Sequence, residues 1–237
     1  MKKLYTSLPE HDRICVKLKG VTVMSNSRIV KYTCPYCKRG FDVEIWDTVT
    51  ASSDPDLRDR CVSGDVFRLS CPHCKEEFMV QYPLVYIDED HKFVLWLSEQ
   101  EAPVSLKQTT KPLTERGYVL RRCASLKEFC EKIQILEDGV SDVIAELAKF
   151  DSFIEFTDNG KGTAEEITAV EYQRTENGIM KITVRCADKG MSFLIPLTML
   201  EEEIAQNPEL YEVGNDIFPL INSEWIMSLY QEADGTA

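Results

Sequence analysis

Alternating apolar and polar residues dominate the first half of the chain and predict strands. Between residues 41 and 45 every second side chain is apolar, and Asp42 and Glu44 stand between them. This period of two is typical of a strand with one buried face. Similar patterns predict strands at 13–19, 21–24, 28–33, 82–87, 92–97 and 118–123. Asn26 and Ser27 are predicted to form a turn.

Helical signals are fewer and separate these strands. Asp54 followed by Pro55 is typical of an N-cap and a first helical position, and Gly64 is a helix stop. A short helix is therefore predicted near 55–62. Ser125 is predicted to cap a second helix, which ends at Asp138-Gly139, and a third is predicted near 141–150.

The last third of the chain predicts a second mixed module. Asn177-Gly178 lies between two strand-like segments, 167–174 and 179–186, and is a strong hairpin signal. A strand at 191–197 and helices at 198–206 and 223–231 are predicted to follow. The fold class expected for the whole chain is α+β.

One cysteine motif occurs twice, as Cys34-Pro35-Tyr36-Cys37 and Cys71-Pro72-His73-Cys74. The strand-like flanks place each pair at the turn of a predicted hairpin. Two such pairs are typical of a site in which four thiolates share one metal ion, most often zinc. The 33 residues between Cys37 and Cys71 exceed the common spacing, and the helix predicted near 55–62 accounts for the extra length.

Four thiolates leave no open coordination position, so we expect one structural zinc ion per chain. Redox chemistry is the rival interpretation, because C-P-Y-C matches the glutaredoxin motif and C-P-H-C resembles that of periplasmic disulfide oxidases. Those proteins start a helix at the first cysteine, whereas period-two alternation follows both pairs here. Metal binding is therefore favoured. The remaining cysteines are expected to be small buried hydrophobes: Cys15, Cys61, Cys123, Cys130 and Cys186.

Charge divides the chain unevenly. The net charge is −13, and residues 151–237 alone contain 17 acidic and 5 basic side chains. We therefore expect an N-terminal strand extension at 1–24, a zinc-binding domain at 25–150 and an acidic domain at 151–237. No apolar run approaches the ~20 residues of a membrane span, and no signal peptide is recognisable. A cytoplasmic protein without a membrane partner is expected.

Beyond the cysteines, the sequence resembles the CpXC domain family, named for two C-P-x-C motifs. The resemblance rests on Ile45-Trp46-Asp47, on the approach Ser63–Phe67, on Tyr82–Tyr86, and on the helix and break at 126–139. It implies a zinc-ribbon-like protein of bacteria or archaea, with Cys34, Cys37, Cys71 and Cys74 as the metal ligands. It implies no activity. Lys38 and Lys75 stand where the family frequently has glycine.

These patterns favour a non-catalytic zinc-binding module that interacts with a protein partner or serves as a scaffold. The sequence has no nucleophile–base pair, no phosphate-binding G-x-x-x-x-G-K-[ST] and no G-x-G-x-x-G. A nucleic-acid-binding regulator is one alternative, supported by basic and aromatic residues near the first pair: Lys31, Tyr36, Lys38, Arg39 and Phe41. A thiol-based redox or metal sensor is another, in which thiolate oxidation releases zinc.

Overall fold

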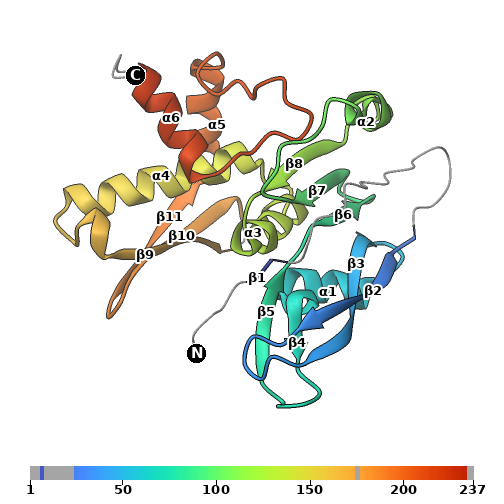
Figure 1. Cartoon of the computed structure of the whole chain (residues 1–237). Coiled ribbons are helices and arrows are strands. Elements are labelled where there is room, and N and C mark those ends of the chain that lie inside the picture. The colour runs from blue at the N-terminus through green and yellow to red at the C-terminus, as the bar shows by residue number, and fades with distance from the viewer. Residues whose placement is uncertain (1–5, 8–23, 174–176, 234–237) are drawn as a thin grey trace. The chain divides into compact units, whose positions relative to one another are not determined.

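The computed structural model describes residues 6–7, 24–173 and 177–233 (Figure 1). The strand predicted at 13–19, most of that at 21–24, and Cys15 lie outside these residues. The chain divides into two compact units. Unit 1 comprises Met1–Cys130 and Asp216–Pro219, and unit 2 comprises Glu131–Asn215 and Leu220–Ala237. No helix of the described part is long and apolar enough to cross a membrane.

The division between the units falls inside a helix, α3 (Leu126–Glu137). The boundary expected between residues 150 and 151 falls within another continuous helix, α4 (Asp142–Asp158). The buried positions of α4 run from Asp142 to Phe156 and so continue across that point. The charge pattern describes the surface of the chain, whereas shared packing decides which segments form one unit.

A five-stranded mixed sheet forms the larger part of unit 1. Its order is β2–β3–β6–β7–β8, and the strands are β2 (Asn26–Thr33), β3 (Gly40–Thr50), β6 (Leu84–Asp88), β7 (Phe93–Leu97) and β8 (Val119–Cys123). β2 pairs antiparallel with β3, β3 parallel with β6, β6 antiparallel with β7, and β7 parallel with β8. All residues of β6 and β7 are buried, as expected for strands with both faces covered.

A smaller sheet completes the strands of unit 1. Its order is β1–β5–β4, from β1 (Thr6–Ser7), β5 (Glu77–Gln81) and β4 (Arg68–Ser70). β4 pairs antiparallel with β5, and β1 pairs parallel with β5. Between β3 and β4 the chain forms α1 (Pro55–Ser63) and a 3-10 turn at Asp65–Phe67.

The helix predicted near 55–62 is confirmed by α1. Gly64 follows it with φ +77°, the left-handed conformation that glycine adopts without strain. Asp54 stands at the N-cap position, but its side chain makes no capping hydrogen bond. The turn predicted at Asn26 and Ser27 is wrong, because both residues belong to β2 and pair with β3. Pairing with a long neighbouring strand overrides the local turn preference of these residues.

One helix of unit 1, α2 (Leu106–Glu115), was not predicted. It contains Pro112, which lacks the N–H of an intrahelical hydrogen bond, and its threonines are weak helix formers. Its stability comes from packing instead: buried Leu106 and Leu113 join a hydrophobic cluster with Val85 and other sheet residues. The set of helices predicted for residues 25–150 is therefore incomplete, since α2 lies in unit 1 together with α1 and the first part of α3.

Unit 2 contains a three-stranded antiparallel sheet in the order β11–β10–β9, formed by β9 (Ile167–Gln173), β10 (Ile179–Cys186) and β11 (Gly190–Pro196). The predicted β9–β10 hairpin is confirmed. Asn177 and Gly178 have φ values of +61° and +72°, the left-handed conformations that favour Asn-Gly in tight turns.

Helices α4, α5 (Leu197–Gln206) and α6 (Ser223–Ala233) complete the core of unit 2. Leu147 of α4, Ile182 of β10 and Ile226 of α6 belong to one buried hydrophobic cluster. Helices and mixed or antiparallel sheets occur in both units, so the α+β class is confirmed.

Candidate metal centre

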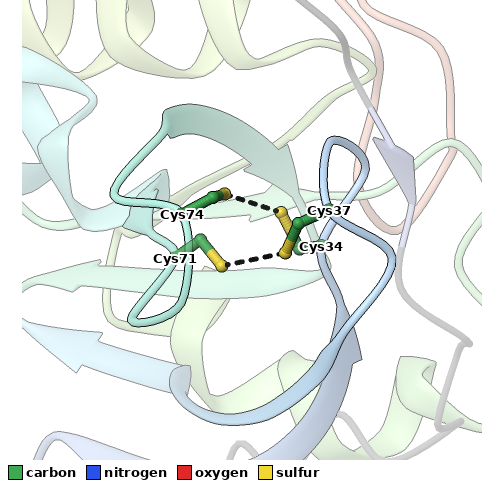
Figure 2. Close-up of side chains that lie close together, drawn as sticks. All are labelled: Cys34, Cys37, Cys71 and Cys74. Atoms are coloured by element: carbon green, nitrogen blue, oxygen red, sulfur yellow. Dashed lines mark hydrogen bonds between the residues drawn. The ribbon is translucent and has the colours of Figure 1, made fainter.

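The structure brings together all four cysteines that the sequence predicts as ligands. Cys34 and Cys37 lie in the turn between β2 and β3, and Cys71 and Cys74 lie in the turn between β4 and β5. The two turns face each other with their thiols directed inward (Figure 2). The Cys34–Cys74 and Cys37–Cys71 sulfur distances are both 3.7 Å, and all four sulfurs lie within 4.8 Å of one another.

Each turn is closed by the same two backbone hydrogen bonds. In the first, the N–H of Cys34 donates to the carbonyl of Arg39, and the N–H of Lys38 donates to the carbonyl of Cys34, both at 3.0 Å. The second turn repeats both bonds around Cys71, at 3.0 and 2.9 Å. The repeat in the sequence is therefore a repeat in backbone geometry, which holds the two sulfurs of each pair on one side of the turn.

Lys38 and Lys75 occupy the conformation that explains why glycine is frequent at these positions. Their φ values are +62° and +65°, a left-handed region that costs a residue with a Cβ about 1 kcal/mol. Lys38 offsets part of this cost, because its Nζ donates to the carbonyl of Pro35 at 2.8 Å. The turns therefore keep their geometry despite the departure from glycine.

The two cysteines of each pair differ in exposure. Cys34 and Cys71, the first of each pair, have no exposed surface, whereas Cys37 and Cys74 are half-buried. The centre is consequently closed on the side of the strands and approachable from the side of the second cysteines.

The two cysteines of the second turn differ in the pKa of their thiols. Burial raises the pKa of Cys71, but backbone N–H groups of Cys74 and His73 and the neighbouring thiols together lower that pKa to about 6. At Cys74 the backbone N–H of Glu76 lowers the pKa, yet burial and the other thiols raise it to about 12. The thiol of Cys71 therefore loses its proton more readily than that of Cys74, and a cation among the sulfurs would favour the thiolate form of Cys74.

Aromatic side chains join the two hairpins beside the sulfurs. Phe78 of β5 stacks on Tyr32 of β2 with ring centroids 5.7 Å apart, and it lies 6.0 Å from the ring of Tyr36 in the first turn. Tyr32 also meets Phe41 of β3 edge-on at 6.0 Å. Phe78 is buried while Phe41, its counterpart in the repeat, is half-buried. Tyr36 and Phe41 thus support the packing of the hairpins.

His73 contacts the opposite hairpin. Its side chain is exposed, and its Nε2 lies 3.3 Å from the carbonyl oxygen of Gly40. A weak polar contact therefore supplements the aromatic one between the hairpins. His73 does not belong to the group of side chains close enough to share a metal ion.

The spacing of the sulfurs fits a tetrahedral ion. Ligands about 2.3 Å from a central zinc ion lie about 3.8 Å from one another, close to the two 3.7 Å distances. Among the described residues, no other group of three or more cysteine, histidine or acidic side chains has this proximity. The cluster can hold a metal ion, and an ion bound by all four sulfurs would have no position left for a substrate.

Two other cysteines of unit 1, Cys61 and Cys130, have thiols whose pKa is raised and lie outside the cluster. Burial raises the pKa of Cys61 to about 12 and that of Cys130 to about 11. The thiol of Cys130 donates to the carbonyl of Cys61 at 3.2 Å. Cys61, Cys123 and Cys186 are buried, which agrees with their expected role as small hydrophobes.

Sequence reasoning missed a buried charge network in unit 2. Lys132 of α3 lies 3.2 Å from Asp142 and 3.8 Å from Glu146 of α4, and all three side chains are nearly inaccessible. Lys149 joins the network through Glu146 at 3.1 Å and Glu131 at 2.8 Å. Burial raises the pKa of Glu146. The helical spacing of Glu146 and Lys149 was visible in the sequence, but only the packing of α3 on α4 buries them.

Comparison with known proteins identifies the family and no closer relative. The family model described as CpXC protein matches residues 32–149, and the chain belongs to this family. No curated protein and no solved structure matches the chain. The match covers both cysteine turns, unit 1 from Tyr32 near the end of β2 to Cys130, and unit 2 from Glu131 to Lys149.

Proposed function

We propose that this member of the CpXC family binds one structural zinc ion through Cys34, Cys37, Cys71 and Cys74. The observation that carries the proposal is that two sulfur–sulfur distances are 3.7 Å, close to the edge of a zinc–thiolate tetrahedron, while all four sulfurs lie within 4.8 Å of one another. Four thiolates suit zinc, which has no geometric preference beyond this arrangement. The two facing hairpins then constitute a zinc-ribbon-like element.

The role of such an ion is to stabilise the fold. The strand that precedes the second turn, β4, has three residues, none of them buried. A metal that links the hairpins contributes its binding free energy to folding, about 10–16 kcal/mol in small zinc domains. A closed thiolate site performs no hydrolysis, so the function of the protein lies in its surfaces.

We therefore propose an interaction or scaffold protein without catalytic activity, whose partner is a protein. Of the basic side chains that could favour nucleic acid, Lys31 is partly neutralised by Asp42 at 3.1 Å. Arg28 on the same strand also pairs with an acidic side chain, Asp47, at 2.8 Å. The net charge of −13 also opposes binding to phosphates.

Metal analysis of the purified full-length chain tests the site. We expect about one zinc ion per chain, and its loss in a Cys34→Ser/Cys71→Ser double variant. Cys186→Ala is the matched control, because it removes a buried cysteine of unit 2 and leaves the four thiols intact. A folded wild-type protein that contains no metal, or iron in place of zinc, would contradict the proposal.

A binding assay tests the choice of partner. The full-length chain is titrated against fluorescent single-stranded and double-stranded DNA and RNA at low salt, where phosphate binding is strongest. We expect no measurable binding. Salt-dependent binding that weakens when Lys31 and Arg39 are replaced by alanine would favour the nucleic-acid alternative instead.

A further inference from the structure

The two edges of the unit 2 sheet differ in what covers them. In an antiparallel pair, residues alternate between those that exchange hydrogen bonds with the neighbour and those whose N–H and C=O groups point away from it. At the β9 edge, the outward N–H of Tyr172 donates to Glu131 Oε1 at 2.8 Å. A side chain of α3 therefore occupies this edge.

The pairing of β11 with β10 shows which of its groups point outward. The N–H of Leu197 donates to the carbonyl of Gly178, and the N–H of Cys186 donates to the carbonyl of Lys189. These two bonds stand at the two ends of the β10–β11 pairing. Counting every second residue between them, the backbone N–H and C=O groups of residues 191, 193 and 195 are directed toward β10. Residues 190, 192, 194 and 196 must therefore direct their backbone groups to the outer edge.

The residues of this outer edge are exposed and uncharged. Gly190, Ser192, Leu194 and Pro196 are all exposed, Leu194 to 67%. Among the described residues, no backbone hydrogen bond outside the helices and the β10–β11 pairing involves the outward N–H or C=O of Gly190, Ser192 or Leu194. β11 carries no charged side chain, although natural edge strands are commonly protected by charges. The edge of β11 is therefore ready to pair with another extended segment.

The charge of the residues that follow β11 in the sequence indicates which kind of segment could bind to this edge. Residues 190–237 contain nine acidic side chains and neither lysine nor arginine. Glu201 and Glu202, exposed on α5, follow β11 within two helical turns. The nearby cations Arg185 and Lys189 pair with acidic side chains of unit 2. Lys181, opposite Leu194 on β10, is half-buried.

We propose that the edge of β11 binds an extended, basic segment of a partner protein as an additional strand. Backbone hydrogen bonds to Ser192 and Leu194 would align the segment, its apolar side chains would cover Leu194, and its basic ones would face the acidic surroundings. A second copy of this chain is disfavoured as the occupant, because it would bring two acidic units together. The proposal is independent of the metal, which concerns unit 1.

The test titrates the full-length protein with a fluorescent peptide of alternating valine and lysine, about as long as the seven-residue β11. We expect saturable binding that weakens with salt, and none of a valine–glutamate peptide. Ser192→Pro removes an outward N–H and is expected to weaken binding about tenfold or more. Ser192→Ala keeps that N–H and is the matched control, expected to bind within about twofold of wild type.

A second variant keeps the test decisive if Ser192→Pro does not fold. Leu194→Lys changes an exposed side chain and places a cation on the edge, so it should also weaken binding about tenfold. Absence of binding, or equal binding of both peptides or of all variants, overturns the proposal. Analytical ultracentrifugation of the protein without peptide tests whether a second copy of this chain binds the edge. A dimer that the Leu194→Lys variant no longer forms would show that it does, and would overturn the proposal. Zinc content is measured on the same samples, so failure of the metal proposal is seen separately.

Discussion

The two cysteine hairpins of unit 1 share one turn geometry but differ in how the surrounding fold holds them. All eight residues of β2 pair with β3, and β3 continues into the five-stranded sheet by pairing with β6. In the second hairpin, β4 has three residues, and the other neighbour of β5 is the two-residue β1. The first hairpin is thus anchored by pairing along its length, the second by far fewer backbone contacts.

This difference shows which features of the site follow from the local sequence and which depend on tertiary contacts. The repeated C-P-x-C sequence forms the same turn in both places, with the same hydrogen bonds and the same left-handed lysine. The packing of Phe78 against the first hairpin and, as we propose, the metal ion hold the second turn opposite the first. The second hairpin should therefore depend more strongly on both.

Removal of the proposed metal should produce the largest effect, and this effect should be much larger in the second hairpin than in the first. After chelation, we expect amide exchange in β4 and β5 to accelerate by on the order of 100-fold or more, and that in β3 by less than about tenfold, because local opening follows the number of remaining contacts. Hydrogen-exchange mass spectrometry measures both in one sample, with β10 as the internal reference. Equal acceleration in β3 and β5 would show that the anchoring of β3 contributes nothing.

Replacement of the paired phenylalanines should give the next largest difference. Phe78→Ala removes a side chain that is 5% exposed, stacks on Tyr32 and contacts the ring of Tyr36, and we expect a loss of about 3–4 kcal/mol of unfolding free energy. Phe41→Ala, at the equivalent but half-buried position, should cost about 1 kcal/mol. Urea denaturation of the metal-loaded variants measures the two losses. Similar values would mean that the repeat is symmetric in energy as well as in sequence.

Glycine at the two left-handed positions should stabilise the hairpins unequally. Lys75→Gly relieves backbone strain and should gain about 0.5–1 kcal/mol. Lys38→Gly should gain less, since it also loses the Nζ hydrogen bond to Pro35, for which the described residues give Lys75 no equivalent. Chelator competition reports the gain as tighter metal binding. Lys75→Ala is the control, because it retains a Cβ and should gain nothing; an equal gain there would rule out strain as the cause.

The smallest effect is expected at His73. Its contact with Gly40 is long and exposed, so His73→Ala should cost at most about 0.5 kcal/mol and leave the metal content unchanged. Tyr36→Ala is the comparison in the other turn and should cost about 1 kcal/mol, because the ring covers part of Phe78. Metal analysis accompanies the stability measurement. Loss of metal in His73→Ala would contradict a site built from thiols alone.

Elements with a strong local signal were predicted well. α1 follows from Pro55 at its start and Gly64 at its end, and the β9–β10 hairpin follows from Asn177-Gly178. Elements that depend on distant partners were not. α2 contradicts its own propensity because the sheet buries Leu106 and Leu113, and Asn26 and Ser27 form strand because β3 pairs with them.

By itself, the sequence determined the four clustered cysteines, their position at hairpin turns and the α+β class, since these depend on short-range chemistry and side-chain periodicity. Only the tertiary structure decided which hairpin is firmly anchored, where unit 1 ends within α3, and which edge of the β9–β11 sheet is left uncovered. These features depend on contacts between residues far apart in the chain, and no local pattern encodes the free energy of such contacts.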